Sequence, residues 1–141
     1  MTESTVDVKL RSARVARLAT RDLEGRPHVV PVCYAYEERA FYTPVDRKPK
    51  RVPFEELARI RNIRANPDVA LLVDQYDEDW DQLWYILVRG HGEILPAGKE
   101  QSEAVQRLRK KYPQYLSLQL LPMEAPVIRI SPTKIISWGL L

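Results

Sequence analysis

Residues 28–36 read His28-Val29-Val30-Pro31-Val32-Cys33-Tyr34-Ala35-Tyr36, and the predicted sheet is built around this stretch. It is rich in β-branched and aromatic residues, as strands are. A partly alternating segment at 15–20 precedes it, and the turn formers of Asp22-Leu23-Glu24-Gly25-Arg26-Pro27 separate the two. We therefore expect a hairpin. Pro31 cannot donate a ladder hydrogen bond, so its part of the strand is expected at an edge, at a bulge or beside a ligand.

Further strands and a helix follow this hairpin. A polar connection leads to a third antiparallel strand, Ala40-Phe41-Tyr42-Thr43. Pro53 suits the first turn of a helix, whose apolar stripe Phe54, Leu57, Ile60 and Ile63 stops at Asn66-Pro67. Residues 69–73 form a short buried-strand pattern.

The second half of the chain adds two strands and a helix. The run 83–95 predicts a long strand, and Gly90-His91-Gly92 within it predicts a bulge or bend. One apolar face predicts a helix over 99–112, followed by a short helical segment within 115–121. Residues 126–138 predict the closing strand, bent at Ser131-Pro132. This order favours a mainly β (α+β) fold, an antiparallel barrel of six strands with helices packed outside it.

Composition narrows the class of protein. With 141 residues and 45% hydrophobic content, we expect one domain over residues 1–141. Cys33 is the single cysteine, and no His/Cys cluster has zinc-ligand spacing, so a cytoplasmic protein without a structural metal is expected. Charges or prolines interrupt every apolar run, so no segment of about 20 residues suited to crossing a bilayer is expected.

A basic segment, Tyr42-Thr43-Pro44-Val45-Asp46-Arg47-Lys48-Pro49-Lys50-Arg51, carries the strongest chemical signal. It lies between a strand end and a helix start, where side-chain cations and free backbone N–H groups favour a phosphate. A solvated surface loop is the alternative interpretation.

Other candidate sites have weaker support. Cys33 lies in an apolar strand without a nearby cation in the sequence, and His28 and His91 fall in no catalytic or metal motif. The acidic loop at 77–81 lacks the spacing of a calcium loop. A late group of aromatic residues suits a core, a dimer interface or a wall beside a planar ring: Trp80, Trp84, Tyr85 and Trp138.

Taken together, these segments resemble the pyridoxamine-phosphate-oxidase-like split β-barrels, from about Val15 to Trp138. More narrowly, a set of short motifs looks like the deazaflavin-dependent subgroup. The motifs are residues 15–20, 25–32 and 46–51, Arg61-Asn62-Ile63, Asn66-Pro67 and Leu71-Leu72-Val73-Asp74. The resemblance implies a homodimeric split barrel with two equivalent cofactor sites formed by both subunits. The short chain lacks a basic C-terminal substrate segment, which disfavours pyridoxamine-phosphate oxidase activity itself.

The resemblance also implies a cofactor, F420 with FMN as the alternative, and a set of site residues. Lys48, Lys50 and Arg51 match the positions that hold the cofactor phosphate. The ring system would lie along two strands, beside Val30, Pro31, Val32, Tyr42 and Thr43, and Trp80, Trp84 and Trp138 are candidates for closing the site from the partner subunit. The hydride chemistry would belong to the ring, so no catalytic acid or base is assigned.

Three functions are weighed. The first is an oxidoreductase that transfers a hydride between F420 or FMN and a small conjugated organic substrate. The second is a non-catalytic binding protein for a flavin, deazaflavin or tetrapyrrole. The third, nucleic-acid binding, is suggested by a pI near 9.1, but no recognition motif accompanies it. We therefore expect neither nucleic acid nor a membrane as a partner.

Overall fold

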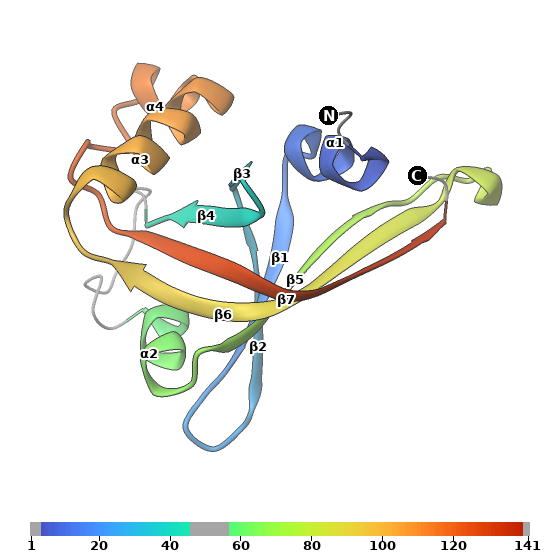
Figure 1. The fold of residues 1–141 in the computed structure, drawn as a ribbon, viewed down its shortest axis with the longest axis horizontal. Coiled ribbons are helices and arrows are strands. Elements are labelled where there is room, and N and C mark those ends of the chain that lie inside the picture. The colour runs from blue at the N-terminus through green and yellow to red at the C-terminus, as the bar shows by residue number, and fades with distance from the viewer. Residues whose placement is uncertain (1–3, 46–56, 140–141) are drawn as a thin grey trace.

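The computed structural model describes residues 4–45 and 57–139. Strands dominate it, and helices flank the sheet (Figure 1). The elements in chain order are α1 (Thr5–Ser12), β1 (Ala16–Arg21), β2 (Pro27–Val32), β3 (Ala35–Glu37), β4 (Ala40–Pro44), α2 (Ala58–Ala65), β5 (Asp68–Gln75), the 3-10 turn η2 (Trp80–Gln82), β6 (Trp84–Leu95), α3 (Lys99–Lys111), α4 (Gln114–Ser117) and β7 (Val127–Gly139).

The seven strands form one antiparallel sheet in the order β2-β1-β5-β6-β7-β4-β3. The two edge strands, β2 and β3, are consecutive in sequence and only Cys33 and Tyr34 separate them. Their nearest Cα atoms therefore lie within about 11 Å, because consecutive Cα atoms are 3.8 Å apart. The sheet curls until its two edges approach without pairing, which confirms the predicted split barrel.

The strand expected over residues 28–36 is divided into two, so residues 4–45 and 57–139 contribute seven strands to the sheet where six were expected. The division falls at Tyr34, whose backbone N–H donates to the Tyr112 hydroxyl (3.2 Å) and whose own hydroxyl donates to the Leu10 carbonyl. These bonds replace ladder bonds at the break. Pro31 lies in β2 at the sheet edge, opposite Arg17 of β1, as its missing N–H predicted.

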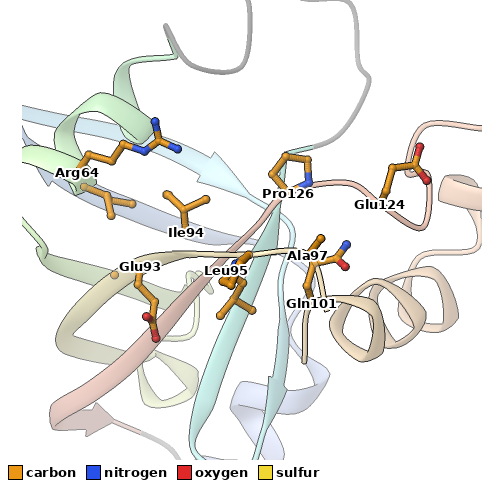
Figure 2. Close-up of a pocket in the computed structure, with 11 residues that line it drawn as sticks. Arg64, Glu93, Ile94, Leu95, Ala97, Gln101, Glu124 and Pro126 are labelled. Atoms are coloured by element: carbon orange, nitrogen blue, oxygen red, sulfur yellow. The ribbon is translucent and has the colours of Figure 1, made fainter. Parts of the chain in front are cut away.

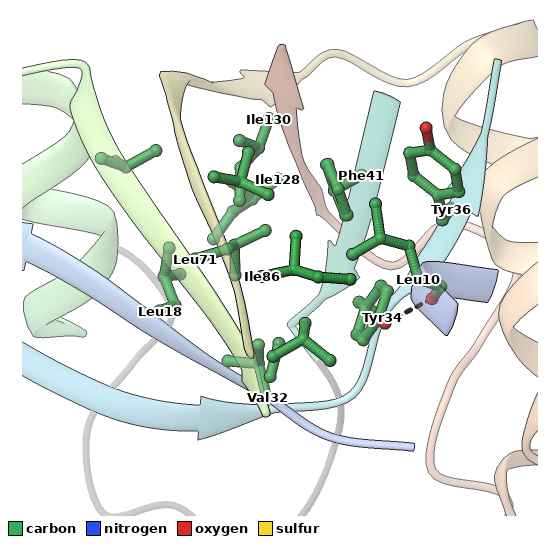
Figure 3. Packing of buried hydrophobic residues seen from close by; sticks show 14 of the residues in the cluster. Leu10, Leu18, Val32, Tyr34, Tyr36, Phe41, Leu71, Ile86, Ile128 and Ile130 are labelled. Carbon is green, nitrogen blue, oxygen red and sulfur yellow. Dashed lines mark hydrogen bonds between the residues drawn. The ribbon is translucent and has the colours of Figure 1, made fainter. Parts of the chain in front are cut away.

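Large apolar side chains fill the inside of the barrel (Figure 3). Leu18, Leu71 and Ile86 come from three adjacent strands and are fully buried. The helix α2 adds Ile60 and Ile63 to this cluster. The sequence placed the start of this helix at Pro53, which lies outside the described residues. It also placed Leu57 within the helix, which is wrong, because Leu57 is extended and the helix begins at Ala58. Its end at Asn66 is confirmed, since the Asn66 N–H caps the helix on the Asn62 carbonyl.

The strands β6 and β7 run together as one long curved ribbon across the molecule (Figure 1). Their register shifts between Arg89 and Gly90, which confirms the predicted bulge. At Gly90 a Cβ atom would collide with the Ser131 carbonyl oxygen, so the close backbone approach requires glycine. Helices α3 and α4 lie at one end of the ribbon and β7 ends at the other.

The helix expected over 99–112 is confirmed as α3, and it packs on a second apolar cluster. The N-terminal helix α1 was not expected. Its signal was present in the sequence: the Ser4 hydroxyl accepts from the Asp7 N–H (3.1 Å) as an N-cap, and Leu10 is buried. None of the helices within the described parts of the chain has the length and hydropathy needed to span a membrane.

Candidate functional site

The split of the barrel is bordered by strands whose backbones are paired on one side only. Among the described strands, β2 has β1 as its single neighbour. β4 pairs with β3 through residues 40–42 alone, so β7 is the only described strand that pairs with Thr43 and Pro44. Because edge strands present unpaired N–H and C=O groups, this border suits a polar planar ligand.

Thr43 provides a second polar feature at this border. Its side chain is 2% exposed, yet its hydroxyl has no hydrogen-bond partner among the described residues. Leaving such a group unsatisfied costs about 1–3 kcal/mol, so an unpaired buried hydroxyl at an open edge indicates a missing partner. The Nδ1 atom of His28 in β2 is likewise buried without a partner among the described residues. From the sequence, His28 was interpreted as an ordinary strand residue, and this unpaired atom was not predicted.

The other predicted ring neighbours face in different directions. Val30 and Val32 contribute to the barrel core, whereas the intervening Pro31 is exposed on the outer side of β2. The Tyr42 side chain points away from Thr43 and donates to Glu100 of α3 (2.8 Å). Burial and the Glu100 carboxylate raise the pKa of Tyr42 to about 12, so this phenol remains protonated at neutral pH.

The predicted phosphate ligands Lys48, Lys50 and Arg51 lie outside the described residues. Their segment follows Val45, whose N–H donates to the Pro126 carbonyl (3.0 Å), and it leads to Leu57 at the cap of α2. Val45 itself directly follows the one-sided part of β4. The basic segment therefore follows directly, along the chain, from the border of the split.

The three tryptophans lie at the far end of the β6–β7 ribbon. Thr43 of β4 is paired with Ile128 of β7, which is paired in turn with Ile94 of β6. Ile94 is ten residues along β6 from Trp84, so these two residues are about 30 Å apart at the usual rise of a strand. Trp138 is half exposed and stacks on Tyr85 (centroids 5.8 Å apart), and Trp80 is 71% exposed. Trp84 is buried beneath the Lys9 amine. Thr43 and these tryptophans are therefore not brought together within one protomer.

A pocket of about 600 Å³ lies between α2, the end of β6 and the start of α3 (Figure 2). Among its described lining residues the charged side chains are Arg64, Glu93 and Glu124, so this part of the lining carries more negative than positive charge. The Gln101 amide in its wall donates to the Met123 and Ala125 carbonyls (2.8 and 2.7 Å). The described part of this lining does not suit a phosphate, and no predicted site residue is among its described residues.

A second hollow, of about 580 Å³, lies on the outer face of the sheet. His91 Nδ1 is 3.0 Å from Asp68 Oδ1, and Arg21 is 3.2 Å from the other oxygen of that carboxylate. The pairing satisfies Asp68 with two surface partners. Among the described residues, no group of three His, Cys, Asp or Glu side chains is arranged to hold a metal ion.

Comparison with known proteins gives the family. A curated relative, the 5a,11a-dehydrotetracycline/5a,11a-dehydrooxytetracycline reductase of Streptomyces rimosus, is 27% identical over 93% of this chain and 78% of its own length. A conserved hypothetical protein from Mycobacterium tuberculosis shares the fold, with a TM-score of 0.79, 20% identity and coverage of 99% and 85% of the two chains. An F420 reductase also shares it, with a TM-score of 0.67, 22% identity and coverage of 96% and 98%.

These likenesses agree with the family-level match. The sequence model of the family described as pyridoxamine 5'-phosphate oxidase covers residues 1–139, nearly the whole chain. The curled antiparallel sheet with flanking helices has the architecture of the solved relatives. The chain belongs to the pyridoxamine 5'-phosphate oxidase family.

Proposed function

We propose that this protein is an oxidoreductase that holds F420, or alternatively FMN, in the split of its barrel and transfers a hydride between that cofactor and a small conjugated organic substrate. The observation that carries the proposal is the unpaired buried hydroxyl of Thr43 at an open strand border. A cofactor ring with polar atoms along its edge would supply the missing partner. Family membership makes a flavin-type ring the natural choice.

Different residues would bind the ring and the phosphate of the cofactor. The free backbone edge of β2 at Val30–Val32 and the Thr43 hydroxyl would orient the ring by hydrogen bonds. Lys48, Lys50 and Arg51 would bind the phosphate through charge-assisted hydrogen bonds. The ring supplies the hydride chemistry when bound, and the protein contributes position and electrostatics. No side chain is assigned as a catalytic acid or base.

The functional unit in this proposal is a homodimer. The outer face of the sheet exposes apolar side chains that the described helices leave uncovered, among them Val29, Tyr85 and Trp138. A second copy packed on this face would bury them and place its tryptophans where one protomer's own tryptophans do not reach. This arrangement gives Trp80 and Trp138 the role of closing the partner's site, whereas Trp84 is buried in its own barrel and is withdrawn from that role.

Two comparisons support the reaction class. The reductase of Streptomyces rimosus acts, by its name, on a dehydrotetracycline, which is a conjugated polycyclic compound. The structural likeness to an F420 reductase, together with the deazaflavin-type motifs, favours F420 over FMN. A non-catalytic carrier of a flavin, deazaflavin or tetrapyrrole would use the same border, so catalysis has to be measured separately from binding.

The test is a titration of the purified protein with F420 and with FMN, followed by absorbance. We expect tight F420 binding, and the variant Lys50→Ala/Arg51→Ala should weaken it at least about tenfold by removing two phosphate ligands. The matched control, Lys99→Ala/Lys110→Ala, removes two exposed cations of α3 and should leave the affinity unchanged. Reduced F420 is then mixed with a panel of conjugated ketones and quinones.

Each outcome has a clear meaning. F420 binding with substrate-dependent reoxidation supports the full proposal. Tight binding without hydride transfer to any substrate supports the carrier instead. Preferential FMN binding moves the protein to the flavin branch, and binding of neither cofactor contradicts the proposed site.

A further inference from the structure

A smaller pocket, of about 280 Å³, lies between α1, the end of β5 and the start of β6. Its wall includes Lys9 from α1, Gln75 from β5 and Trp84 from β6. Gln75 and Trp84 are paired across the two strands. The pocket lies at the far end of the β6–β7 ribbon from Thr43, so it is separate from the proposed cofactor site of the same protomer.

Two hydrogen-bond donors of this wall have no acceptor among the described residues. Trp84 is 6% exposed, and its Nε1 atom is buried without a partner. The Lys9 amine lies 5.2 Å from the centre of the Trp84 ring on a partly buried side chain, and no described residue forms a hydrogen bond or an ion pair with it. An indole N–H and an ammonium can only donate, so a group that satisfies both must carry acceptor oxygens.

The charges around the pocket favour an acceptor with a single negative charge. Among the described lining residues Asp74 is the one acid, and its Oδ1 is 2.9 Å from Arg17 Nη1. Arg17 therefore offsets Asp74, and Lys9 and Arg14 leave the wall positive. Asp74 would still repel the second charge of a dianion such as phosphate. A carboxylate has two acceptor oxygens and one charge, which matches this wall.

We propose that this pocket binds the carboxylate of a small organic monoacid, with one oxygen on the Lys9 ammonium and the other on the Trp84 indole N–H. Lys9 has a flexible four-carbon stem, and its rotation toward the anion uncovers the indole edge. Both hydrogen bonds are charge-assisted. Ala13 and Val15 in the same wall contact the body of the acid. The pocket volume is near the lower end for small-molecule sites, so this apolar body is short.

The experiment uses butyrate as the probe and the indole N–H signals of nitrogen-15-labelled protein as the NMR readout. The chain has three tryptophans, and the variants Trp80→Phe, Trp84→Phe and Trp138→Phe assign their signals. The Trp84 signal should shift saturably with butyrate, with a Kd of about 1 mM or tighter, while the other two signals stay in place. Butyramide has nearly the same shape without the charge and should bind at least about tenfold more weakly.

Two variants test the two donors separately. Lys9→Met keeps the side-chain length, removes the charge and should weaken butyrate binding at least about tenfold. Trp84→Phe keeps an aromatic ring, removes the N–H group and should weaken binding about fivefold, followed through the Gln75 backbone amide signal. The control Lys110→Met removes an exposed cation of α3 and should leave the affinity unchanged. The remaining indole signals report whether each variant is folded.

The possible results separate the proposal from weaker explanations. A saturable shift that depends on the carboxylate charge and on Lys9 supports it. The proposal is overturned by a Trp84 signal that does not respond to butyrate, by equal binding of butyramide, or by unchanged affinity in folded Lys9→Met. Inorganic phosphate is tested as a second anion, and tighter binding of phosphate than of butyrate would overturn the assignment to a carboxylate.

Discussion

The two faces of the sheet show a sharp contrast along the same strands. Neighbouring residues of β6 make the point: Ile86 is fully buried in the barrel, while Leu87 lies on the outer face, in a row with Leu72 and Ile136. The inner face is packed by side chains from seven strands and by α1 and α2. The outer face keeps Val29, at 59% exposure, and Trp138, at 53%, in contact with solvent.

The difference between the two faces indicates that the inner face stabilises the protomer, whereas the outer face is suited to association with another molecule. A closed inner core provides the free energy of folding, since burial of apolar area is the main favourable term. An uncovered apolar sheet face adds little to the stability of one protomer, but contiguous exposed patches of this kind mark interaction sites. Strand periodicity lets one sequence carry both functions on alternate residues.

The largest expected effect comes from breaking the inner face. Ile86→Ala should lower the free energy of unfolding by about 2–5 kcal/mol, because it leaves a cavity in a fully buried position. The matched variant Leu87→Ala, one residue along the strand, should cost less than about 1.5 kcal/mol. Urea denaturation at fixed protein concentration measures both, and equal losses would contradict the proposed division between the faces.

The outer face is tested through self-association. Trp138→Ala removes a half-exposed ring stacked on Tyr85 and should weaken the proposed homodimer about tenfold, or about 1.4 kcal/mol. Sedimentation velocity across a concentration series gives the dissociation constant. Leu23→Ala, in the exposed β1–β2 turn, is the control and should leave it unchanged. A monomeric wild-type protein would refute the dimer directly.

Thr43 sharpens the comparison, because it is a polar residue on the inner face. Thr43→Val keeps the side-chain shape and removes the unpaired hydroxyl, so stability should stay equal or rise by about 1 kcal/mol. Affinity for F420 should fall about fivefold through the lost hydrogen bond. Thr133→Val, on an exposed part of β7, serves as the control for affinity. A strong loss of stability would show that the hydroxyl has a structural partner instead.

The smallest expected effect lies at the rim of the inner face, where the Tyr36 hydroxyl donates to Asp7 of α1 (2.6 Å). This bond, with a further bond from Ser4, lowers the pKa of Asp7 below its ordinary value of 3.8. A carboxylate with a lowered pKa in the folded state stabilises the fold above its ordinary pKa, and this contribution is lost as the pH falls below it.

Melting temperatures measured from about pH 6 to about pH 2 test this contribution. The wild-type protein should lose more stability over the acidic part of this range than Tyr36→Phe does, because the variant lacks the main cause of the shift. Parallel curves for the two proteins would contradict the assignment.

Much of the fold followed from local patterns. The hairpin, the long glycine-containing strand and the helix α3 were predicted because alternation, turn residues and an apolar helical face are all encoded within about a dozen residues. The division of residues 28–36 was not predictable in this way. It depends on Tyr112, 78 residues from Tyr34 along the chain, whose hydroxyl takes the place of a strand partner.

The candidate site shows the same limit. Sequence alone named Thr43, Val30 and the basic segment with Lys50 as site residues. For Pro31 it left an edge, a bulge or a position beside a ligand open, and the structure places it at the edge. The sequence also grouped Trp84 with the exposed tryptophans, although Trp84 is buried beneath Lys9. The grouping of tryptophans along the sequence does not show whether each side chain faces the barrel core or the solvent.

The amino-acid sequence by itself determined the class of fold, the succession of most strands and helices along the chain and the position of the basic segment, because these depend on side-chain periodicity and turn chemistry over short distances. Only the tertiary structure decided which polar groups lack partners and which cations are desolvated. The unpaired Thr43 hydroxyl and the partly buried Lys9 side chain over Trp84 arise from packing between segments remote in sequence. Hydrogen-bond satisfaction and burial are properties of that packing, so local sequence does not specify them.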